Sequence, residues 1–246
     1  MTTSADLDDA SLAAGLAETA GRLLMTLRES GLLEGKSLGD AGDQTANAFL
    51  MAAIAQHRPD DGVLSEERVD DLSRLHKRRV WIIDPLDGTR EYAEGRDDWA
   101  VHVALAIDGH AAVGAVALPA QGRLLRSDQP PAPVERPARV RMLVSRTRPP
   151  QECHRVADAL GAELIPMGSA GAKAMAVLLG QGDVYLHSGG QYQWDNAAPV
   201  AVALGAGMVA ERIDGNPCAY NARETLLPDL LICPPEYRER VRAALA

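Results

Sequence analysis

The chain has 246 residues, of which 46% are hydrophobic, and carries a formal net charge of −9. This composition predicts a globular protein of one large or two modest domains, and the absence of a long apolar run argues against a membrane-spanning protein. The acidic balance repels polyanions, so we expect neither nucleic acid nor a membrane as partner, although a small phosphorylated ligand bridged by cations is compatible with it. Residues 1–14 lack the basic stretch followed by an apolar stretch that is typical of a secretory signal, so we predict a cytoplasmic protein.

The first half of the chain predicts two helices followed by strands. Apolar residues recur at helical spacing over residues 7–27, and Asp43 is a candidate N-cap for a second helix over residues 44–57. Residues 80–83 predict a buried strand. The turn Asp108-Gly109 joins two further strands, residues 101–107 and 112–118, in a predicted hairpin.

The second half predicts alternating strands and helices, which is typical of α/β layering. Its predicted strands are residues 140–144, 163–166, 184–186, 208–212 and 230–233. Its predicted helices are residues 151–160, 170–179, one that opens at Asp195, and 237–245. Four prolines lie between residues 127 and 137, so we divide the chain into an N-terminal half (1–126), a connection (127–138) and a C-terminal half (139–246).

Three short acidic segments contain the candidate metal ligands. Glu66 follows Ser65, Asp84 and Asp87 lie in the motif Asp-Pro-Leu-Asp-Gly-Thr after a predicted strand, and Asp195 follows Trp194. Each segment alone is compatible with an ordinary turn, loop or helix start. Together they offer the carboxylate oxygens that Mg²⁺ prefers, and a strand ending at Asp84 would hold two of them at the mouth of a sheet.

The residues after Asp87 are suited to an anion. Gly88 lacks a side chain where a phosphate must approach the backbone, and the amides of Gly88, Thr89 and Arg90 can act as a helix N-terminus that binds phosphate. The Leu86 carbonyl can face the same site. The motif therefore predicts a phosphate site beside a metal site, and the corresponding reaction is metal-assisted hydrolysis of a phosphate ester.

In this order and spacing, the three segments resemble the inositol monophosphatase superfamily of lithium-sensitive, Mg²⁺-dependent phosphatases. The resemblance covers about residues 36–221 and implies an α/β/α/β/α sandwich, like that of fructose-1,6-bisphosphatase. It implies two or three Mg²⁺ ions and inhibition by Li⁺. The ligands that it implies are Glu66, Asp84, the Leu86 carbonyl, Asp87 and Asp195.

Two further segments resemble the branch of 3′(2′),5′-bisphosphate nucleotidases, which includes the CysQ type. They are Arg90-Glu91-Tyr92 and the run from Gly168 to Lys173, and His187 stands where inositol phosphatases place a glutamate. The resemblance thus implies hydrolysis of 3′-phosphoadenosine 5′-phosphate to AMP and phosphate, a clearance step in sulfate assimilation. Two alternatives remain open: a broader phosphatase of inositol 1-phosphate or fructose 1,6-bisphosphate, and a metal-binding regulator without turnover.

The resemblance also implies roles for individual side chains. Glu66 and Thr89 would orient the attacking water and take its proton, and Asp43 would support Thr89. The residues that we expect to contact substrate are Asp87, Gly88, Thr89, Arg90, Ser169, Lys173 and His187. For Arg90 and Lys173 a solvated surface position is the alternative, and for Ser169 a simple N-cap.

Some features remain outside this scheme. Asp40 and Ser65 depart from the Thr and Gly that the family commonly has, and Asp40 either adds charge near a third metal or is a solvated loop residue.

We expect a monomer or a homodimer. The remaining histidines share no spacing with the acidic segments, and we assign no chemistry to them: His57, His76, His102, His110 and His154.

Overall fold

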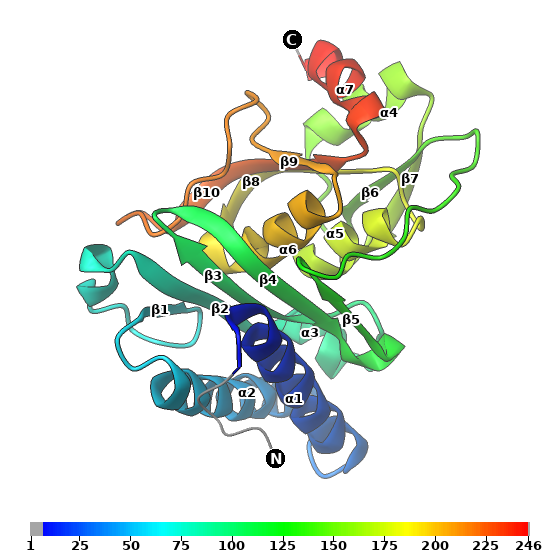
Figure 1. Cartoon of the computed structure of the whole chain (residues 1–246). Helices are drawn as coiled ribbons and strands as arrows, with labels where there is room; N and C mark the ends of the chain where they lie inside the picture. The colour runs from blue at the N-terminus through cyan, green and yellow to red at the C-terminus, as the bar shows by residue number, and fades with distance from the viewer. Residues whose placement is uncertain (1–6, 246) are drawn as a thin grey trace.

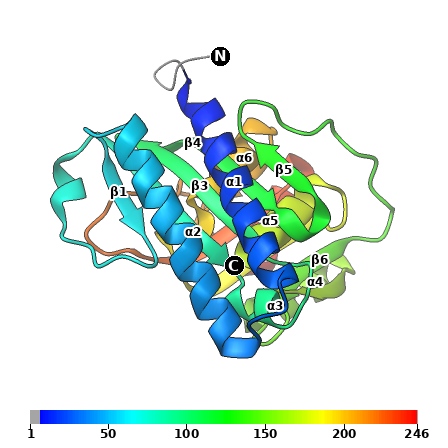
Figure 2. The same cartoon turned by 90° about the horizontal axis from the view of Figure 1, so that it is seen from below.

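The computed structural model describes residues 7–245, and its helices and sheets stack in five layers (Figure 1). The prediction of a cytoplasmic protein rests partly on residues 1–6, which lie outside the described residues. The first layer consists of α1 (Asp9–Glu29) and α2 (Gly35–His57), which lie side by side across the first sheet (Figure 2). Asp8 caps α1, since its side chain accepts a hydrogen bond of 2.7 Å from the Ser11 amide.

The second layer is a five-stranded sheet in the order β1-β2-β3-β4-β5. β1 pairs parallel to β2, and the other neighbours are antiparallel. The tight turn at Asp108-Gly109 joins β3 to β4 and confirms the predicted hairpin. The strands are β1 (Gly62–Ser65), β2 (Arg79–Asp87), β3 (Ala100–Ile107), β4 (His110–Leu118) and β5 (Arg123–Arg126).

The middle layer contains α5 (Ala170–Leu178) and α6 (Gln193–Gly205), which lie between the two sheets (Figure 1). α6 contacts β2, β3 and β4 of the first sheet and β8 and β10 of the second. Both helices are therefore apolar almost all round, as expected for helices that are buried on opposite sides.

The fourth layer is a mixed sheet in the order β7-β6-β8-β10-β9, and α4 (Gln151–Leu160) and α7 (Arg238–Leu245) cover its outer face. Its strands are β6 (Arg141–Ser145), β7 (Glu163–Met167), β8 (Val184–Tyr192), β9 (Val209–Glu211) and β10 (Leu226–Cys233). The layers confirm the expected α/β/α/β/α sandwich.

The predicted proline-rich connection separates the strands of the two sheets along the sequence. One core cluster nevertheless combines residues from both halves, such as Ile82 and Val116 of the first sheet with Ala198 of α6 and Leu143 of the second sheet. The division into two halves stays a prediction.

The predicted start of the second helix was wrong. Asp43 is not an N-cap, because α2 begins eight residues earlier, at Gly35, and Asp43 lies inside it. Gly39 and Gly42 lower the local helix propensity of this stretch, but they also let α2 pack closely against its neighbours, and packing prevails.

Smaller differences concern strands and one helix end. β1 and β5, each of only four residues, were not predicted, and α6 begins at Gln193, two residues before Asp195. Short strands bury too few side chains to give a clear alternation.

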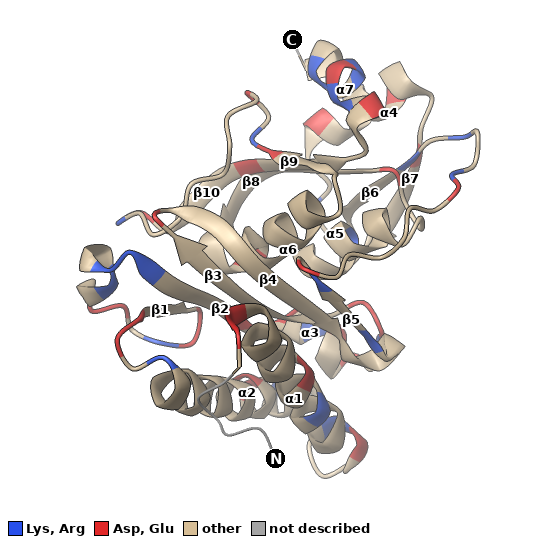
Figure 3. Cartoon of the chain, in the orientation of Figure 1, with Lys and Arg blue, Asp and Glu red and all other residues tan. Residues whose placement is uncertain are grey.

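Charged residues of both signs occur on the outer helices α1, α2, α4 and α7, whereas β3 and β4 have none (Figure 3). Several form ion pairs between layers; for example, Arg79 of β2 contacts Asp9 of α1 at 3.0 Å and Asp61 at 2.9 Å. Within residues 7–245, every helix falls short of the length or hydropathy that a bilayer crossing requires.

Candidate active site

The acidic motif lies at the end of β2, where the strand has a bulge. Asp84 pairs with His102 of β3 and Asp87 with Ala100, so the register shifts between the two aspartates. Pro85 has no amide hydrogen for the ladder, which is compatible with a bulge. The Asp84 side chain is only 1% exposed and accepts a hydrogen bond of 3.0 Å from the Leu86 amide.

The carboxylates of Asp84, Asp87 and Asp195 converge, whereas the predicted ligand Glu66 is not part of this group. One oxygen from each lies within 4.8 Å of the others, although β2 and α6 are distant in sequence. Asp195 is the third residue of α6 and accepts a 2.6 Å hydrogen bond from the Tyr192 amide, which closes a capping box. We name these three residues the acidic cluster.

Glu66 lies on the loop after β1, at the same opening. Its amide donates to the Ile83 carbonyl at 3.4 Å, which joins this loop to β2 beside Asp84. Glu66 keeps part of its surface in contact with solvent, whereas Asp84 is buried. Glu66 is therefore placed to meet a ligand that approaches the acidic cluster from outside.

The start of α5 holds Asp87 in place. Oδ2 of Asp87 accepts hydrogen bonds from Ser169 Oγ at 2.5 Å and from the Gly171 amide at 2.6 Å, and Oδ1 accepts one from the Ala170 amide at 3.2 Å. Ser169 also caps α5 through the Ala172 amide. The N-cap interpretation of Ser169 is thus confirmed, and its contact with substrate stays a prediction.

The site is rich in negative charge that the surrounding protein does not balance. Burial raises the pKa of Asp84 well above its usual range, and the charges of Glu66, Asp87 and Asp195 raise it further. Burial, followed by the charge of Asp87, raises the pKa of Asp195 to about 7. Burial also raises the pKa of Glu66 to about 7, although a hydrogen bond with Asp84 acts in the opposite direction. Such a set of converging oxygens fits a divalent cation, which would offset this repulsion.

Asp87 behaves differently from its neighbours. Burial alone would raise its pKa, but His102, Ser169 and the Gly171 amide stabilise the charged form and lower the pKa to about 2. Asp87 is therefore the member of the acidic cluster that stays ionised most readily.

Thr89 and Asp43 meet because α2 approaches the site closely. A side chain at Gly39 would come within 2.7 Å of the Thr89 methyl group, so glycine is required for this approach. Thr89 Oγ1 lies 3.4 Å from Asp43 Oδ2 and 3.2 Å from the Leu86 carbonyl. Burial raises the pKa of Asp43 to about 7, and the charge of Glu67 adds to this.

The sequence analysis missed His102, because spacing along the chain does not reveal a cross-strand neighbour. The ring is completely buried; Nδ1 lies 3.0 Å from the Trp194 carbonyl and Nε2 lies 3.2 Å from Oδ2 of Asp87. His102 therefore lies in contact with the acidic cluster, although its spacing along the chain did not indicate this. A single histidine in an otherwise apolar strand, opposite the acidic motif in the hairpin register, was the signal that could have indicated it.

A cleft of about 490 Å³ opens beside the acidic cluster. The lining includes every residue that we expected to contact substrate, together with Glu66 and Asp195: Asp87, Gly88, Thr89, Arg90, Ser169, Lys173 and His187. Gly88 has φ of 91°, a conformation that favours glycine, and this bend directs the chain from β2 into the short helix α3 (Thr89–Ala93).

Lys173 has a mainly internal role in this structure. It is 5% exposed, and its ammonium group donates to the carbonyls of Gly168 and Ser169, the latter at 2.6 Å. The solvated alternative for Lys173 is therefore wrong. Burial also lowers the pKa of Lys173 to about 8 and shifts the pKa of His187 downward.

The cleft contains two arginines that the sequence analysis did not consider. Arg146 donates to Glu91 at 2.8 Å and contacts Glu94 at 2.9 Å, so acidic partners neutralise it. Arg148 and Arg90 form no ion pair with any of the described residues. These two guanidinium groups are available to an anion in the cleft.

The two departures from the family pattern have local explanations. Ser65 is buried and donates to Asn47 Oδ1 of α2 at 2.8 Å, which ties the Glu66 loop to the first layer. Asp40 lies in α2, not in a loop, and forms an exposed pair of 2.6 Å with Lys36.

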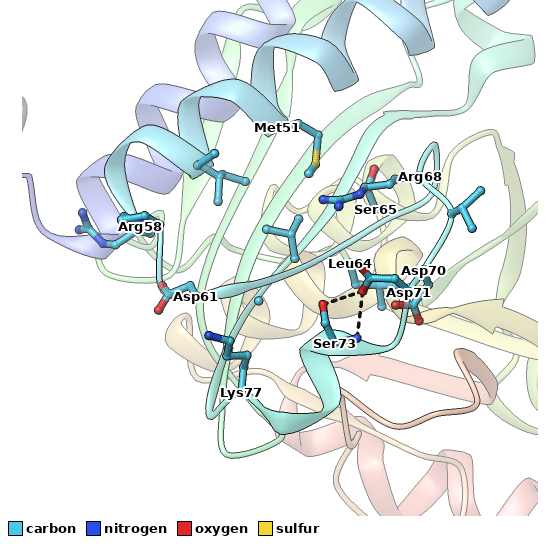
Figure 4. A pocket seen from close by; sticks show the side chains of 16 residues that line it. Met51, Arg58, Asp61, Leu64, Ser65, Arg68, Asp70, Asp71, Ser73 and Lys77 are labelled. Atoms are coloured by element: carbon cyan, nitrogen blue, oxygen red, sulfur yellow. Dashed lines mark hydrogen bonds between the residues drawn. The ribbon is translucent and has the colours of Figure 1, made fainter.

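A second cavity, of about 240 Å³, lies on the other side of β1, between α2 and the segment after Glu66 (Figure 4). Several charged side chains around it already have partners: Arg58 contacts Asp9, Asp61 contacts Arg79, and Asp71 accepts from Ser73. None of the predicted site residues lines it. The chemistry is therefore concentrated in the larger cleft.

Comparison with known proteins agrees with this geometry. The model of the "Inositol monophosphatase family" matches residues 8–245. The chain is 51% identical over 244 residues to a "3′-phosphoadenosine 5′-phosphate phosphatase" of Mycobacterium leprae, with 93% of this chain and 90% of the relative covered. It is 50% identical over 238 residues to the protein of the same name from Mycobacterium bovis, with 92% and 89% covered.

A solved structure supports the fold. CysQ from Bacteroides thetaiotaomicron, described as a bacterial member of the inositol monophosphatase family, superimposes with a TM-score of 0.77 at 24% identity. The superposition covers 92% of this chain and 97% of that one.

Proposed function

Because the chain belongs to the inositol monophosphatase family, we propose that it is a Mg²⁺-dependent phosphatase that removes the 3′-phosphate of 3′-phosphoadenosine 5′-phosphate, giving AMP and phosphate. The observation that carries this proposal is that Asp84, Asp87 and Asp195 converge beside a cleft whose lining includes two arginines, Arg90 and Arg148, without an ion pair to any described residue. This arrangement suits a substrate with two phosphate groups.

The residues that would hold Mg²⁺ are Glu66, Asp84, the Leu86 carbonyl, Asp87 and Asp195. When bound, Mg²⁺ supplies positive charge to the phosphoryl oxygens and acidifies the attacking water. The carboxylates fit this ion because they are hard oxygen donors that lack a balancing cation of the protein. The number of ions, two or three, follows the family resemblance.

Glu66 and Thr89 are the groups that we assign to the attacking water. Glu66 lines the cleft beside the acidic cluster, where its carboxylate can accept a proton from a water molecule. Thr89 can donate its own proton to Asp43, which leaves a lone pair of Oγ1 free to accept from the water. Asp43 thereby sets the orientation of Thr89.

The cleft has room and positive charge for a second phosphate group of the substrate, and this supports a bisphosphate as the substrate class. The amides of Gly88, Thr89 and Arg90 lie beside the acidic cluster and would receive the phosphate that is cleaved. Arg90, Arg148 and His187 line the same cleft and would contact the 5′-phosphate or the nucleoside. Guanidinium groups bind phosphate with two parallel hydrogen bonds, so they favour a bisphosphate over a monophosphate.

Phosphate release from a substrate panel tests the proposal. The panel contains 3′-phosphoadenosine 5′-phosphate, inositol 1-phosphate, fructose 1,6-bisphosphate and AMP, each with Mg²⁺ and with a chelator. We expect the highest kcat/KM for the bisphosphate nucleotide, little release from AMP, and none with the chelator. A higher kcat/KM for inositol 1-phosphate or the fructose ester would replace this substrate by the broader alternative.

A further inference from the structure

His102 connects the parts of the acidic cluster that come from different layers. It lies on β3 opposite Asp84 in the strand register, contacts Oδ2 of Asp87 and faces the carbonyl of Trp194, the residue before Asp195. One ring therefore contacts the β2 bulge and the first turn of α6.

The orientation of the ring follows from its partners. A carbonyl oxygen only accepts hydrogen bonds, so Nδ1 must donate to Trp194, and this fixes the ring plane. Nε2 then lies 3.2 Å from Asp87 and makes no hydrogen bond of ordinary geometry with any of the described residues. A carboxylate oxygen also only accepts, so Asp87 is a partner for Nε2 when this nitrogen carries a proton as well and the ring is cationic.

The first turn of α5 is shaped to accept the same ring. A side chain on Gly171 would overlap Nε2 of His102, so only glycine permits the present packing. The Gly171 amide at the same time donates to Asp87 at 2.6 Å. His102 and Gly171 thus approach the same carboxylate oxygen from two sides.

We propose that His102 is a positioning residue for the metal site, which fixes the Asp87 carboxylate relative to Asp195. This inference rests on the proposed metal-dependent function and concerns the same site. Oδ2 of Asp87 faces His102, Ser169 and the Gly171 amide. Oδ1 accepts a single, longer hydrogen bond of 3.2 Å from the Ala170 amide, so Oδ1 is the oxygen with capacity left for an ion. Side chains that orient a ligand in this way typically change metal affinity by about 10- to 100-fold when removed.

Substitution of His102 tests this role directly. In H102L both nitrogens are lost at similar volume, whereas in H102Q an amide group remains that can reach one partner. The matched control is H110L, which removes an exposed histidine of the same hairpin, distant from the acidic cluster in the β3–β4 register. All variants are made in the full chain.

Binding of Mn²⁺ to the metal-free proteins, followed by electron paramagnetic resonance, is the main measurement because it needs no substrate. We expect a dissociation constant about 10- to 100-fold higher in H102L, a smaller increase in H102Q, and no change in H110L. Thermal unfolding separates this effect from packing. If H102L only lowers the melting temperature while the folded protein binds Mn²⁺ as the wild type does, the positioning role is refuted.

A measurement on the wild type covers the case in which H102L fails to fold. The Nδ1 proton of a buried, hydrogen-bonded ring exchanges slowly with water, which identifies the His102 signal in a nitrogen-15 spectrum. We expect saturating Mg²⁺ to shift both ring nitrogens, and an unchanged spectrum would overturn the inference.

The inference and the proposed function can fail separately. Loss of Mn²⁺ affinity in H102L, together with no phosphate release by the wild type, would refute the phosphatase and support the positioning role. Normal hydrolysis by the wild type, together with unchanged Mn²⁺ affinity in H102L, would support the phosphatase and refute the positioning role.

Discussion

Two buried aspartates differ in the charges that surround them: Asp183, which immediately precedes β8 of the second sheet, and Asp84, which lies on β2 of the first sheet. Asp183 is 0% exposed and contacts Arg136 at 3.0 Å and the Arg141 side chain at 3.2 Å, and it accepts a 2.7 Å hydrogen bond from the Arg141 amide. Asp84 is 1% exposed, has Asp87 and Asp195 nearby, and forms no ion pair with any of the described residues.

The comparison shows how to distinguish scaffold from site. A buried charge is tolerated when arginines pair with it and hydrogen bonds satisfy it, as at Asp183. Where several carboxylates converge without such partners, the missing charge has to come from outside the chain. Asp183 therefore contributes to stability, and Asp84 to ion binding.

The substitution D84N tests the role of Asp84 in ion binding and should have the largest effect. We expect turnover to fall by about 10³-fold, or ~4 kcal/mol of transition-state stabilisation, because a central metal ligand is lost. The metal-free protein should unfold at the wild-type temperature or above, since one repulsive charge is gone. Phosphate release and calorimetry measure the two effects, and wild-type rates at ordinary Mg²⁺ concentrations would exclude Asp84 as a ligand.

The converse substitution, D183N, should affect stability. Removing this carboxylate leaves Arg136 and Arg141 without their buried partner, and we expect a loss of about 3 kcal/mol in the free energy of unfolding. Chemical denaturation measures it. The folded variant should keep the wild-type kcat/KM and Mn²⁺ affinity, and a loss of Mn²⁺ binding would contradict the division into scaffold and site.

Asp43 is an intermediate case, because it has neither an arginine partner nor a place in the acidic cluster. In D43N the contact with Thr89 changes from a charged to a neutral acceptor, and we expect kcat to fall about 10-fold, or ~1.4 kcal/mol. Mn²⁺ affinity should remain unchanged. Steady-state kinetics and the Mn²⁺ titration together test this, and an equal loss in both would place Asp43 among the ligands.

The stability of the metal-free protein should depend on pH, and bound Mg²⁺ should remove this dependence. Asp195 has a folded-state pKa of about 7 against 3.8 when unperturbed, so between these values the folded state binds more protons than the unfolded state. Its contribution to stability is therefore present below about pH 4 and is lost as the pH rises to about 7.

Because Mg²⁺ binds the deprotonated cluster, its stabilising effect should be larger at about pH 8 than at about pH 5.5, by a few degrees of melting temperature. Differential scanning calorimetry with Mg²⁺ or a chelator measures the difference. D84N is the control in which the Mg²⁺ effect should be small at both pH values, and an equal effect at both pH values in the wild type would argue against unpaired carboxylates.

The parts of the site that follow local signals were predictable from the sequence. Asp84 and Asp87 come directly after an apolar strand, and Ser169 precedes a clear helix, so their positions on the elements could be inferred. The convergence of Asp195 with them came from the family resemblance, since nothing local indicates that α6 meets β2.

What the sequence could not provide depends on tertiary packing. The early start of α2 is determined by the close approach of Gly39 to Thr89, which outweighs a weak helix propensity. The role of His102 depends on the strand register and on the missing side chain of Gly171. The buried lysine, Lys173, depends on carbonyls that only the folded turn directs toward it.

The position of α6 between the sheets has a consequence for biosynthesis. Ile82, Ala104 and Val116 of the first sheet belong to the same core cluster as Ala198 of α6. A ribosome would therefore have to deliver about four fifths of the polypeptide before this apolar surface is covered. Until then the nascent chain exposes the apolar face of the first sheet to solvent. We therefore expect molecular chaperones to bind it during translation.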